Sequence, residues 1–210
     1  MKVAEQETAA ALIPPDAGLD ELRGIAAGCR ACDLWARGTQ TVFGDGPKRA
    51  RLMLVGEQPG DAEDETGHPF VGPAGHLLDR ALERAGIDRE DAYLTNAVKH
   101  FKWEPRGKRR IHKKPRASEI AACRPWLDTE IALVRPEAIV CLGATAAQAL
   151  LGRSFRLTAH RGLFVDSALA PLVLATVHPS AILRAPDAET RHRETARFVD
   201  DLRLVAGRLS

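Results

Sequence analysis

The stretch RLMLVGE, residues 51–57, is an uninterrupted apolar run that stops at a glycine followed by a glutamate. A short run without polar alternation is typical of a β-strand that is buried on both faces. Such a strand lies inside a parallel sheet with helices on either side of it. The segment therefore predicts an α/β protein.

Segments of both kinds alternate along the rest of the chain. We predict three more strands, at 92–98, 138–143 and 171–177, and helices at 18–36, 73–86, 117–134, 144–151 and 189–209. Ser118 is the expected cap of the helix at 117–134, and a short helix is expected to begin at Ala181. This alternation predicts a three-layer α/β/α fold with a mostly parallel central sheet of about four strands.

Composition and length fit a single domain. The chain has 210 residues, 45% of them hydrophobic and 5% aromatic, so Ala, Leu and Val must supply most of the core. We expect a mobile tail over 1–17 and one domain over 18–210. No run approaches the ~18 apolar residues of a membrane span, and the polar, acidic start is unlike a signal peptide. A cytoplasmic monomer is the expected state.

Positive charge is concentrated between residues 99 and 116. Nine of these eighteen residues are Lys or Arg, although the net charge of the whole chain is +2. Such a cluster predicts a flexible loop that contacts phosphate, with Lys108, Arg109 and Arg110 as candidate DNA contacts. His112 lies inside this loop, either as one more phosphate ligand or as the group that performs chemistry.

Ligands of parallel sheets bind beyond the carboxyl ends of the strands. That rule selects GEQPGD at 56–61, the segment 96–116, the pair 143–144 and HPSAILR at 178–184. Glu57, Asn96, His112 and His178 are therefore expected to converge. Two simpler interpretations remain open: GEQPGD as a solvated acidic turn, and His178 as a structural histidine at a strand end.

The chain contains four cysteines: Cys29, Cys32, Cys123 and Cys141. A disulfide framework is not expected inside a cell, so metal binding or catalysis is the better interpretation. Four thiolates suit either an iron–sulfur cluster or zinc. The alternative is that Cys123 and Cys141 are ordinary buried residues and the C-x-x-C pair is incidental.

Several motifs in a fixed order resemble those of one family. They are C-x-x-C near the start, GEQPGDAED with HPFVGPAG downstream, TNAVK, two later cysteines and HPS. Together they resemble the iron–sulfur uracil-DNA glycosylases of the family 4 type, from about residue 29 to the C-terminus. The segment KRRIH at 108–112 further resembles the UdgX branch, whose members become covalently attached to uracil-containing DNA.

The resemblance implies a cofactor and a partner. Cys29, Cys32, Cys123 and Cys141 would hold a structural 4Fe–4S cluster, with zinc as the alternative. The partner would be uracil-containing DNA, with single strands accepted, and the protein would associate with the nucleoid when bound to it.

The resemblance also implies roles for individual residues. A glycosylase extrudes its base and reads the base edge in a closed pocket. Asn96 suits uracil O4 and N3–H. Phe70 would stack on the ring, unless it is an ordinary core residue. Further implied contacts are Gln58 with the base, His178 with uracil O2, Ser180 with a phosphate or as a helix cap, and Arg184 with a phosphate or as a solvated helix residue.

The attacking group at C1′ decides the outcome of such a reaction. Water positioned by Glu57 or Asp61 would give free uracil and an abasic site. Attack by His112 would join the protein to the DNA after a single event. We expect a neutral His112, because the surrounding cations disfavour its protonated form. A third possibility is a non-catalytic iron–sulfur module that binds nucleic acid.

Overall fold

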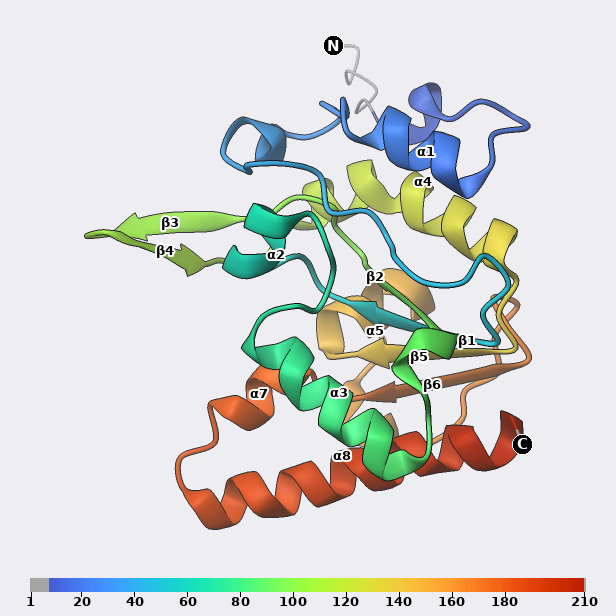
Figure 1. Cartoon of the computed structure of the whole chain (residues 1–210), viewed down its shortest axis with the longest axis vertical. Coiled ribbons are helices and arrows are strands. Elements are labelled where there is room, and N and C mark those ends of the chain that lie inside the picture. The colour runs from blue at the N-terminus through green and yellow to red at the C-terminus, as the bar shows by residue number, and fades with distance from the viewer. Residues whose placement is uncertain (1–7, 210) are drawn as a thin grey trace.

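A four-stranded parallel sheet forms the centre of the computed structural model, which describes residues 8–209 (Figure 1). The strand order is β2-β1-β5-β6. The bounds are Leu52–Gly56 for β1, Ala92–Asn96 for β2, Ala138–Leu142 for β5 and Leu172–Thr176 for β6. The predicted sheet of about four parallel strands is confirmed.

Side chains alternate between two cores because neighbouring residues of a strand point to opposite faces. In β1, Met53 and Val55 join one core, whereas Leu52 and Leu54 join the other. The first core is covered by α1 (Leu19–Ala26), α4 (Ala117–Val134) and α5 (Ala144–Leu151), and the second by α3 (Pro73–Ala85) and α8 (Ala188–Leu209). The three-layer prediction is therefore correct, and Figure 1 shows α4 on one side of the sheet and α3 and α8 on the other.

Shorter elements complete the fold. They are η1 (Ala9–Leu12), η2 (Asp33–Ala36), α2 (Asp61–Thr66), η3 (Arg89–Asp91), α6 (Leu157–His160) and α7 (Pro179–Leu183). A separate antiparallel hairpin consists of β3 (Trp103–Arg106) and β4 (Arg109–His112). The basic segment was predicted to be a flexible loop, and in the structure most of it is this hairpin.

Three local predictions were wrong. The helix expected over 18–36 is α1 followed by the short η2, with the C-x-x-C segment between them. The N-cap of α4 is Arg116, whose backbone N–H donates to the Glu119 carboxylate at 2.6 Å, so Ser118 lies within the first turn. The helix expected from Ala181 begins at Pro179.

The first residues that the structure describes do not form a tail. Residues 1–7 lie outside the described part of the chain, but Ala9 is fully buried, Ala17 is nearly so, and η1 packs against α4. The prediction of a mobile tail is therefore wrong for residues 8–17, because this segment packs against α4. No helix within residues 8–209 has both the length and the apolar character needed to cross a membrane.

The packing of η1 predicts different costs for two neighbouring substitutions. Ala9→Asp buries a carboxylate without a partner and should lower the free energy of unfolding by about 2 kcal/mol or more. Ala10 is exposed, so Ala10→Asp should change it by less than about 0.5 kcal/mol. Urea denaturation of both variants measures the difference. Equal values would contradict the packing of this segment.

Candidate active site at the carboxyl end of the sheet

A narrow space at the ends of β1 and β2 brings three predicted residues together. A Cβ placed on Gly56 would lie 2.3 Å from Asn96 Oδ1 and 2.7 Å from Phe70 Cζ. The ring of Phe70 lies over that of His178, with centroids 6.2 Å apart and an angle of 29° between their planes. Phe70, Asn96 and His178 therefore line one site, which depends on the missing side chain of Gly56.

His178 follows β6, and its proton is fixed by the backbone. The N–H of Ser180 donates to His178 Nδ1 at 3.1 Å, and Ser180 Oγ lies 2.8 Å from the same nitrogen. In the neutral ring, Nε2 must then carry the proton. Burial, and then His112 and Arg184, lower the pKa of His178 to about 4. Near pH 7, His178 is a neutral donor, and Ser180 orients it.

His112 ends β4 beside the carboxylate of Glu57. His112 Nε2 lies 3.5 Å from Glu57 Oε1, and the His112 side chain is 49% exposed. Burial lowers the pKa of His112, Glu57 opposes this effect, and Arg184 adds to it. The expectation of a neutral His112 is supported, but desolvation is the main cause and Arg184 the contributing cation, instead of the cations of the basic segment.

The register of the hairpin decides which of its side chains face the body of the protein. Trp103 pairs with His112, and Pro105 pairs with Arg110, so these four share one face. Trp103 Nε1 donates to the Arg37 carbonyl at 2.9 Å. The intervening residues, Arg109 and Ile111 among them, are exposed on the other face.

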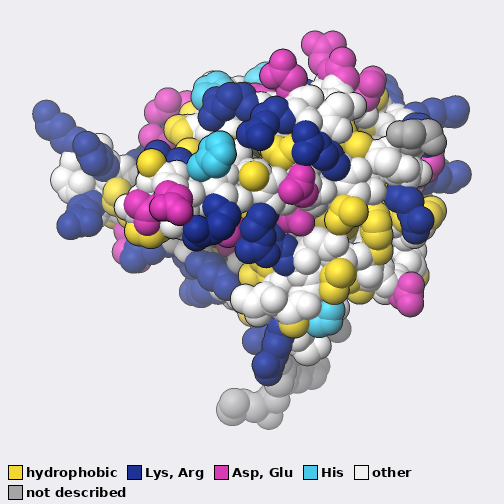
Figure 2. Space-filling model, turned by 90° about the horizontal axis from the view of Figure 1, so that it is seen from below, with side chains coloured by type: hydrophobic (Ala, Val, Ile, Leu, Met, Phe, Trp, Pro, Cys, Tyr) yellow, Lys and Arg dark blue, Asp and Glu magenta, His cyan; other side chains and the backbone are white. Residues whose placement is uncertain are grey.

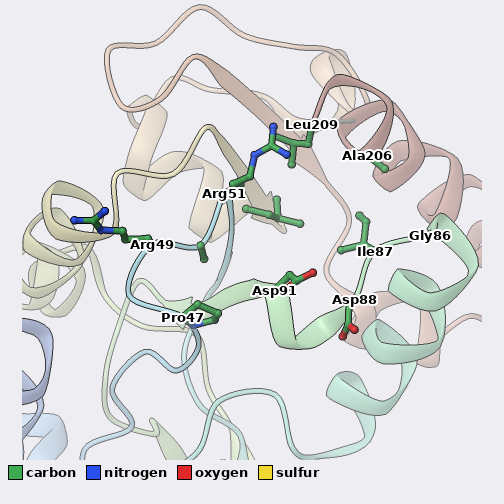
Figure 3. A pocket seen from close by; sticks show the side chains of 11 residues that line it. Pro47, Arg49, Arg51, Gly86, Ile87, Asp88, Asp91, Ala206 and Leu209 are labelled. Carbon is green, nitrogen blue, oxygen red and sulfur yellow. The ribbon is translucent and has the colours of Figure 1, made fainter.

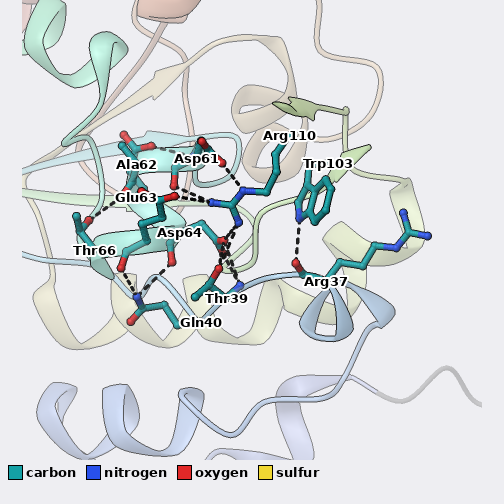
Figure 4. A network of polar contacts seen from close by, with 12 residues as sticks. Arg37, Thr39, Gln40, Asp61, Ala62, Glu63, Asp64, Thr66, Trp103 and Arg110 are labelled. Carbon is teal, nitrogen blue, oxygen red and sulfur yellow. Dashed lines mark hydrogen bonds and ion pairs between the residues drawn. The ribbon is translucent and has the colours of Figure 1, made fainter. Parts of the chain in front are cut away.

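Arg110 is held by acidic residues of the protein itself, although we predicted a DNA contact (Figure 4). Its guanidinium contacts Asp61 and Asp64 at 2.5 Å each and Glu65 at 3.3 Å. The Asp64 side chain is fully buried and also accepts hydrogen bonds from Thr39. Asp61, a candidate for positioning water, belongs to this cluster. Arg110 thus fastens β4 to α2.

Gln58 fastens the base of the hairpin. Its Nε2 donates to the carbonyls of Lys102 at 3.1 Å and Lys113 at 3.2 Å, one on either side of the hairpin. Its Oε1 is buried and has no hydrogen-bond partner among residues 8–209. An orphaned buried acceptor is costly unless a ligand completes it, so the Gln58 side chain can both hold the hairpin and accept from a bound base.

More than half of the cations in the basic segment, residues 99–116, pair with carboxylates of the protein itself. Five of its nine cations form ion pairs with carboxylates: Lys99, Lys102, Arg110, Lys113 and Arg116. Lys108 and Arg109 are exposed at the hairpin tip, which projects from the body in Figure 1 and carries Lys and Arg side chains at the left of Figure 2. Arg184 lies at the end of α7, where its positive charge lowers the pKa of His112 and of His178.

Three of the four cysteines interact with one another. Cys29 and Cys123 are buried and Cys32 half-buried, and burial raises the pKa of the Cys32 thiol, with Cys29 adding to the effect. Burial also raises the pKa of Cys123 to about 12, with Cys32 and Cys29 contributing. Cys141 joins the same core from β5. All four are free thiols.

The chemistry of these four thiols is that of a metal centre. Within residues 8–209, no three His, Cys, Asp or Glu side chains are close enough together to hold one metal ion. The four cysteines come from α4, β5 and the segment before η2, and their thiolates have the donor chemistry of either an iron–sulfur cluster or zinc.

A separate hollow of about 480 Å³ lies at the opposite end of the strands (Figure 3). Its lining includes Arg51 and Leu52 at the start of β1, together with Asp91 and Leu209. It shares no residue with the group around His178 and His112.

Comparisons with known proteins show the family of this chain. The Uracil DNA glycosylase superfamily matches residues 43–203. The chain belongs to this superfamily. Type-4 uracil-DNA glycosylases are among the relatives of this superfamily member. The protein from Thermotoga maritima is 41% identical over 78% of this chain and 82% of its own length. The protein from Sulfurisphaera tokodaii is 33% identical over 90% of this chain and 87% of its own length. The protein from Pyrobaculum aerophilum is 36% identical, over 80% and 86%.

Sequence reasoning missed two groups of residues in this glycosylase-superfamily protein. One is the acidic set on α2, Asp64 above all, that receives Arg110. The acidic run DAEDE at 61–65 was the available signal, because it matches the charge of the basic segment. The other is Glu130, fully buried against Lys99, for which the sequence carries no signal beyond a carboxylate in an apolar helix face.

The ion pairs of Arg110 with α2 predict that this residue keeps the hairpin rigid. Arg110→Met removes the guanidinium that three carboxylates hold, so amide hydrogen exchange across 103–112 should accelerate about tenfold or more. Arg109→Met, one residue away on the outer face, should leave exchange nearly unchanged. Mass spectrometry of the hairpin peptides measures both. Equal protection in the two variants would contradict the anchoring role.

Proposed function

We propose that this protein excises uracil from DNA and traps the deoxyribose covalently through His112, as a member of the UdgX branch. The observation that carries the proposal is the placement of His112: on the body-facing side of an anchored hairpin, 3.5 Å from Glu57 and electrostatically coupled to His178. A phosphate ligand would need neither the carboxylate nor a lowered pKa.

Three residues are proposed to read the flipped uracil. Asn96 offers an acceptor and donors for N3–H and O4. Phe70 stacks on the ring. His178, neutral and protonated on Nε2, donates to O2 and stabilises the negative charge of the departing base, as donors in an oxyanion hole do. The orphaned Gln58 Oε1 supports a further contact with the base.

The proposed reaction breaks one bond and forms another. The N1–C1′ bond breaks, and its electron pair leaves with uracil, so that positive charge develops at C1′. The unprotonated nitrogen of His112 donates its lone pair to C1′ and becomes part of an imidazolium. The remaining N–H proton passes to Glu57 or to solvent. Uracil leaves as an anion and is protonated by solvent, which completes the balance.

We propose that Cys29, Cys32, Cys123 and Cys141 hold a 4Fe–4S cluster, with zinc as the alternative. Such a cluster would supply a structural link between the segment before η2 and the core. Because burial raises the pKa of Cys123 and Cys141 to about 12, the thiols are protonated without metal, and binding would release protons.

The DNA substrate is proposed to lie along the hairpin. Lys108 and Arg109 on the exposed tip, and Arg184 near the pocket, are the proposed phosphate contacts, and Ser180 serves mainly to orient His178. A pocket formed by one chain is consistent with a monomer that accepts single-stranded DNA. We further propose a cytoplasmic protein that joins the nucleoid through its substrate.

An ordinary hydrolytic glycosylase is the second candidate, because the relatives are named Type-4 uracil-DNA glycosylases. In that case Glu57 positions water and the enzyme turns over repeatedly. A module that only binds nucleic acid is a third candidate; it predicts binding that is independent of uracil and falls steeply with salt.

The three candidates give different results with uracil-containing single-stranded DNA. Trapping through His112 predicts a heat-stable shifted band on a denaturing gel, at no more than one DNA per protein. A hydrolytic enzyme instead releases more uracil than there is protein and gives no shifted band. Absence of both products would leave only the binding module. Uracil-free DNA of the same sequence is the control.

Replacing His112 by glycine should convert trapping into turnover. The smaller residue leaves room for water at C1′, so Glu57 and the pocket should release uracil over many cycles while the shifted band disappears. Ile111→Gly, at an exposed position of the same strand, should keep the band. A persistent band in His112→Gly would identify another nucleophile.

Trapping should also depend on pH through His112. The neutral ring reacts, so the rate at saturating DNA should fall as pH drops through the pKa of His112, which lies below the usual 6.5. Arg184 lowers that pKa. Arg184→Gln should therefore raise it and move the acid limb of the profile to higher pH, whereas Arg109→Gln should not. An unchanged limb in Arg184→Gln would contradict this electrostatic role.

A further inference from the structure

A complete ion pair lies inside the protein between α4 and the segment that follows β2. The side chains of Lys99 and Glu130 are 1% and 0% exposed, and their charged groups are in direct contact. Lys99 belongs by sequence to the basic segment, yet it has no access to DNA. Buried charges are tolerated only where they are paired and fully hydrogen-bonded. The hydrogen-bond partners of this pair therefore show which parts of the chain it holds in place.

Every donor of the Lys99 ammonium is used. Nζ donates to Glu130, to Thr95 Oγ1 at 2.6 Å and to the backbone carbonyl of Asn96 at 2.9 Å. Glu130 in turn accepts from the Gly44 N–H at 2.9 Å, from the Tyr93 hydroxyl at 3.0 Å and from Thr95 Oγ1. An ammonium has three protons, so the Asn96 carbonyl receives one of three fully committed hydrogen bonds.

The same residue touches the cysteine site. The backbone N–H of Lys99 donates to Cys123 Sγ at 3.2 Å. Glu130 lies on α4 seven residues after Cys123, two turns along the same face of the helix. Lys99 therefore bridges a cysteine of the proposed cluster and the backbone of the residue proposed to read uracil.

We propose that Lys99 is a positioning residue for uracil recognition: its ammonium fixes the Asn96 backbone and thereby ties the base pocket to the cysteine-bearing helix. The proposal rests on the proposed function. Asn96 Oδ1 lies close against the backbone of Gly56, 2.3 Å from the position that a Cβ on this glycine would take. A small shift of the Asn96 backbone would thus misplace its amide, and displacements of about 1 Å can cost orders of magnitude in rate.

The first test replaces both charges at once. In the double variant Lys99→Met, Glu130→Gln, no charge is left unpaired, the new amide oxygen still accepts from Gly44 and Tyr93, and the backbone bond to Cys123 is unaffected. We expect bound iron and affinity for uracil-free single-stranded DNA to match the wild type, whereas the single-turnover rate with uracil-containing DNA falls about tenfold or more. The matched control is Arg51→Met, Glu137→Gln, an exposed pair at the far end of the sheet, which should react like the wild type.

The second test keeps the pair but changes its shape. Lys99→Arg retains the charge opposite Glu130, but a planar guanidinium cannot replace an ammonium between three acceptors. If the double variant does not fold, Lys99→Arg decides by its melting temperature, iron content and uracil-dependent rate. Loss of rate with iron and melting temperature retained supports positioning. A rate equal to the wild type in either folded variant overturns it.

The wild type run in parallel separates this proposal from the one on which it rests. If wild-type protein shows neither adduct nor uracil release, the proposed function fails and the positioning role falls with it. If the wild type reacts and the folded Lys99 variants react equally well, only the positioning role fails, and the pair is then a structural element.

Discussion

Burial of both faces of the central sheet is the constraint on which the rest of the molecule depends. Each strand sends alternate side chains into two separate cores, such as Met53 into one and Leu54 into the other. Helices must then cover both faces, and polar groups that meet a ligand gather at the strand ends. Glu57, Asn96 and His178 lie at one such end, at or just beyond the last residues of β1, β2 and β6.

Ion pairs with carboxylates of the protein itself hold the basic segment as a hairpin in a fixed position. Two-residue alternation along the hairpin directs Arg110 and His112 to the body and Arg109 to solvent. The acidic α2 holds Arg110, and Gln58 ties the two sides of the hairpin base. A cluster of like charges would otherwise repel itself and remain mobile. Here the fixed end of the hairpin carries His112, the side chain that we propose as the nucleophile.

Two sets of buried polar groups lie beside the candidate site: His178 with Ser180, and Lys99 with Glu130. His178 is kept neutral by burial and is oriented by the Ser180 N–H, so its donor proton is directed before any ligand binds. Lys99 and Glu130 fix the backbone behind Asn96. Groups held in this way lose little freedom when a ligand binds, which is the basis of preorganised recognition.

The sequence by itself determined the layer order, the four parallel strands and the end of the sheet that carries the candidate site, because apolar runs, glycines and helix periods are local signals. It also pointed to Glu57, Phe70, Asn96, His112 and His178. Only the tertiary structure decided that Arg110 serves the hairpin, that Lys99 is buried and that Arg184 acts on His112. These roles depend on which charges meet across 31 to 72 positions of chain, and no local pattern encodes such pairings.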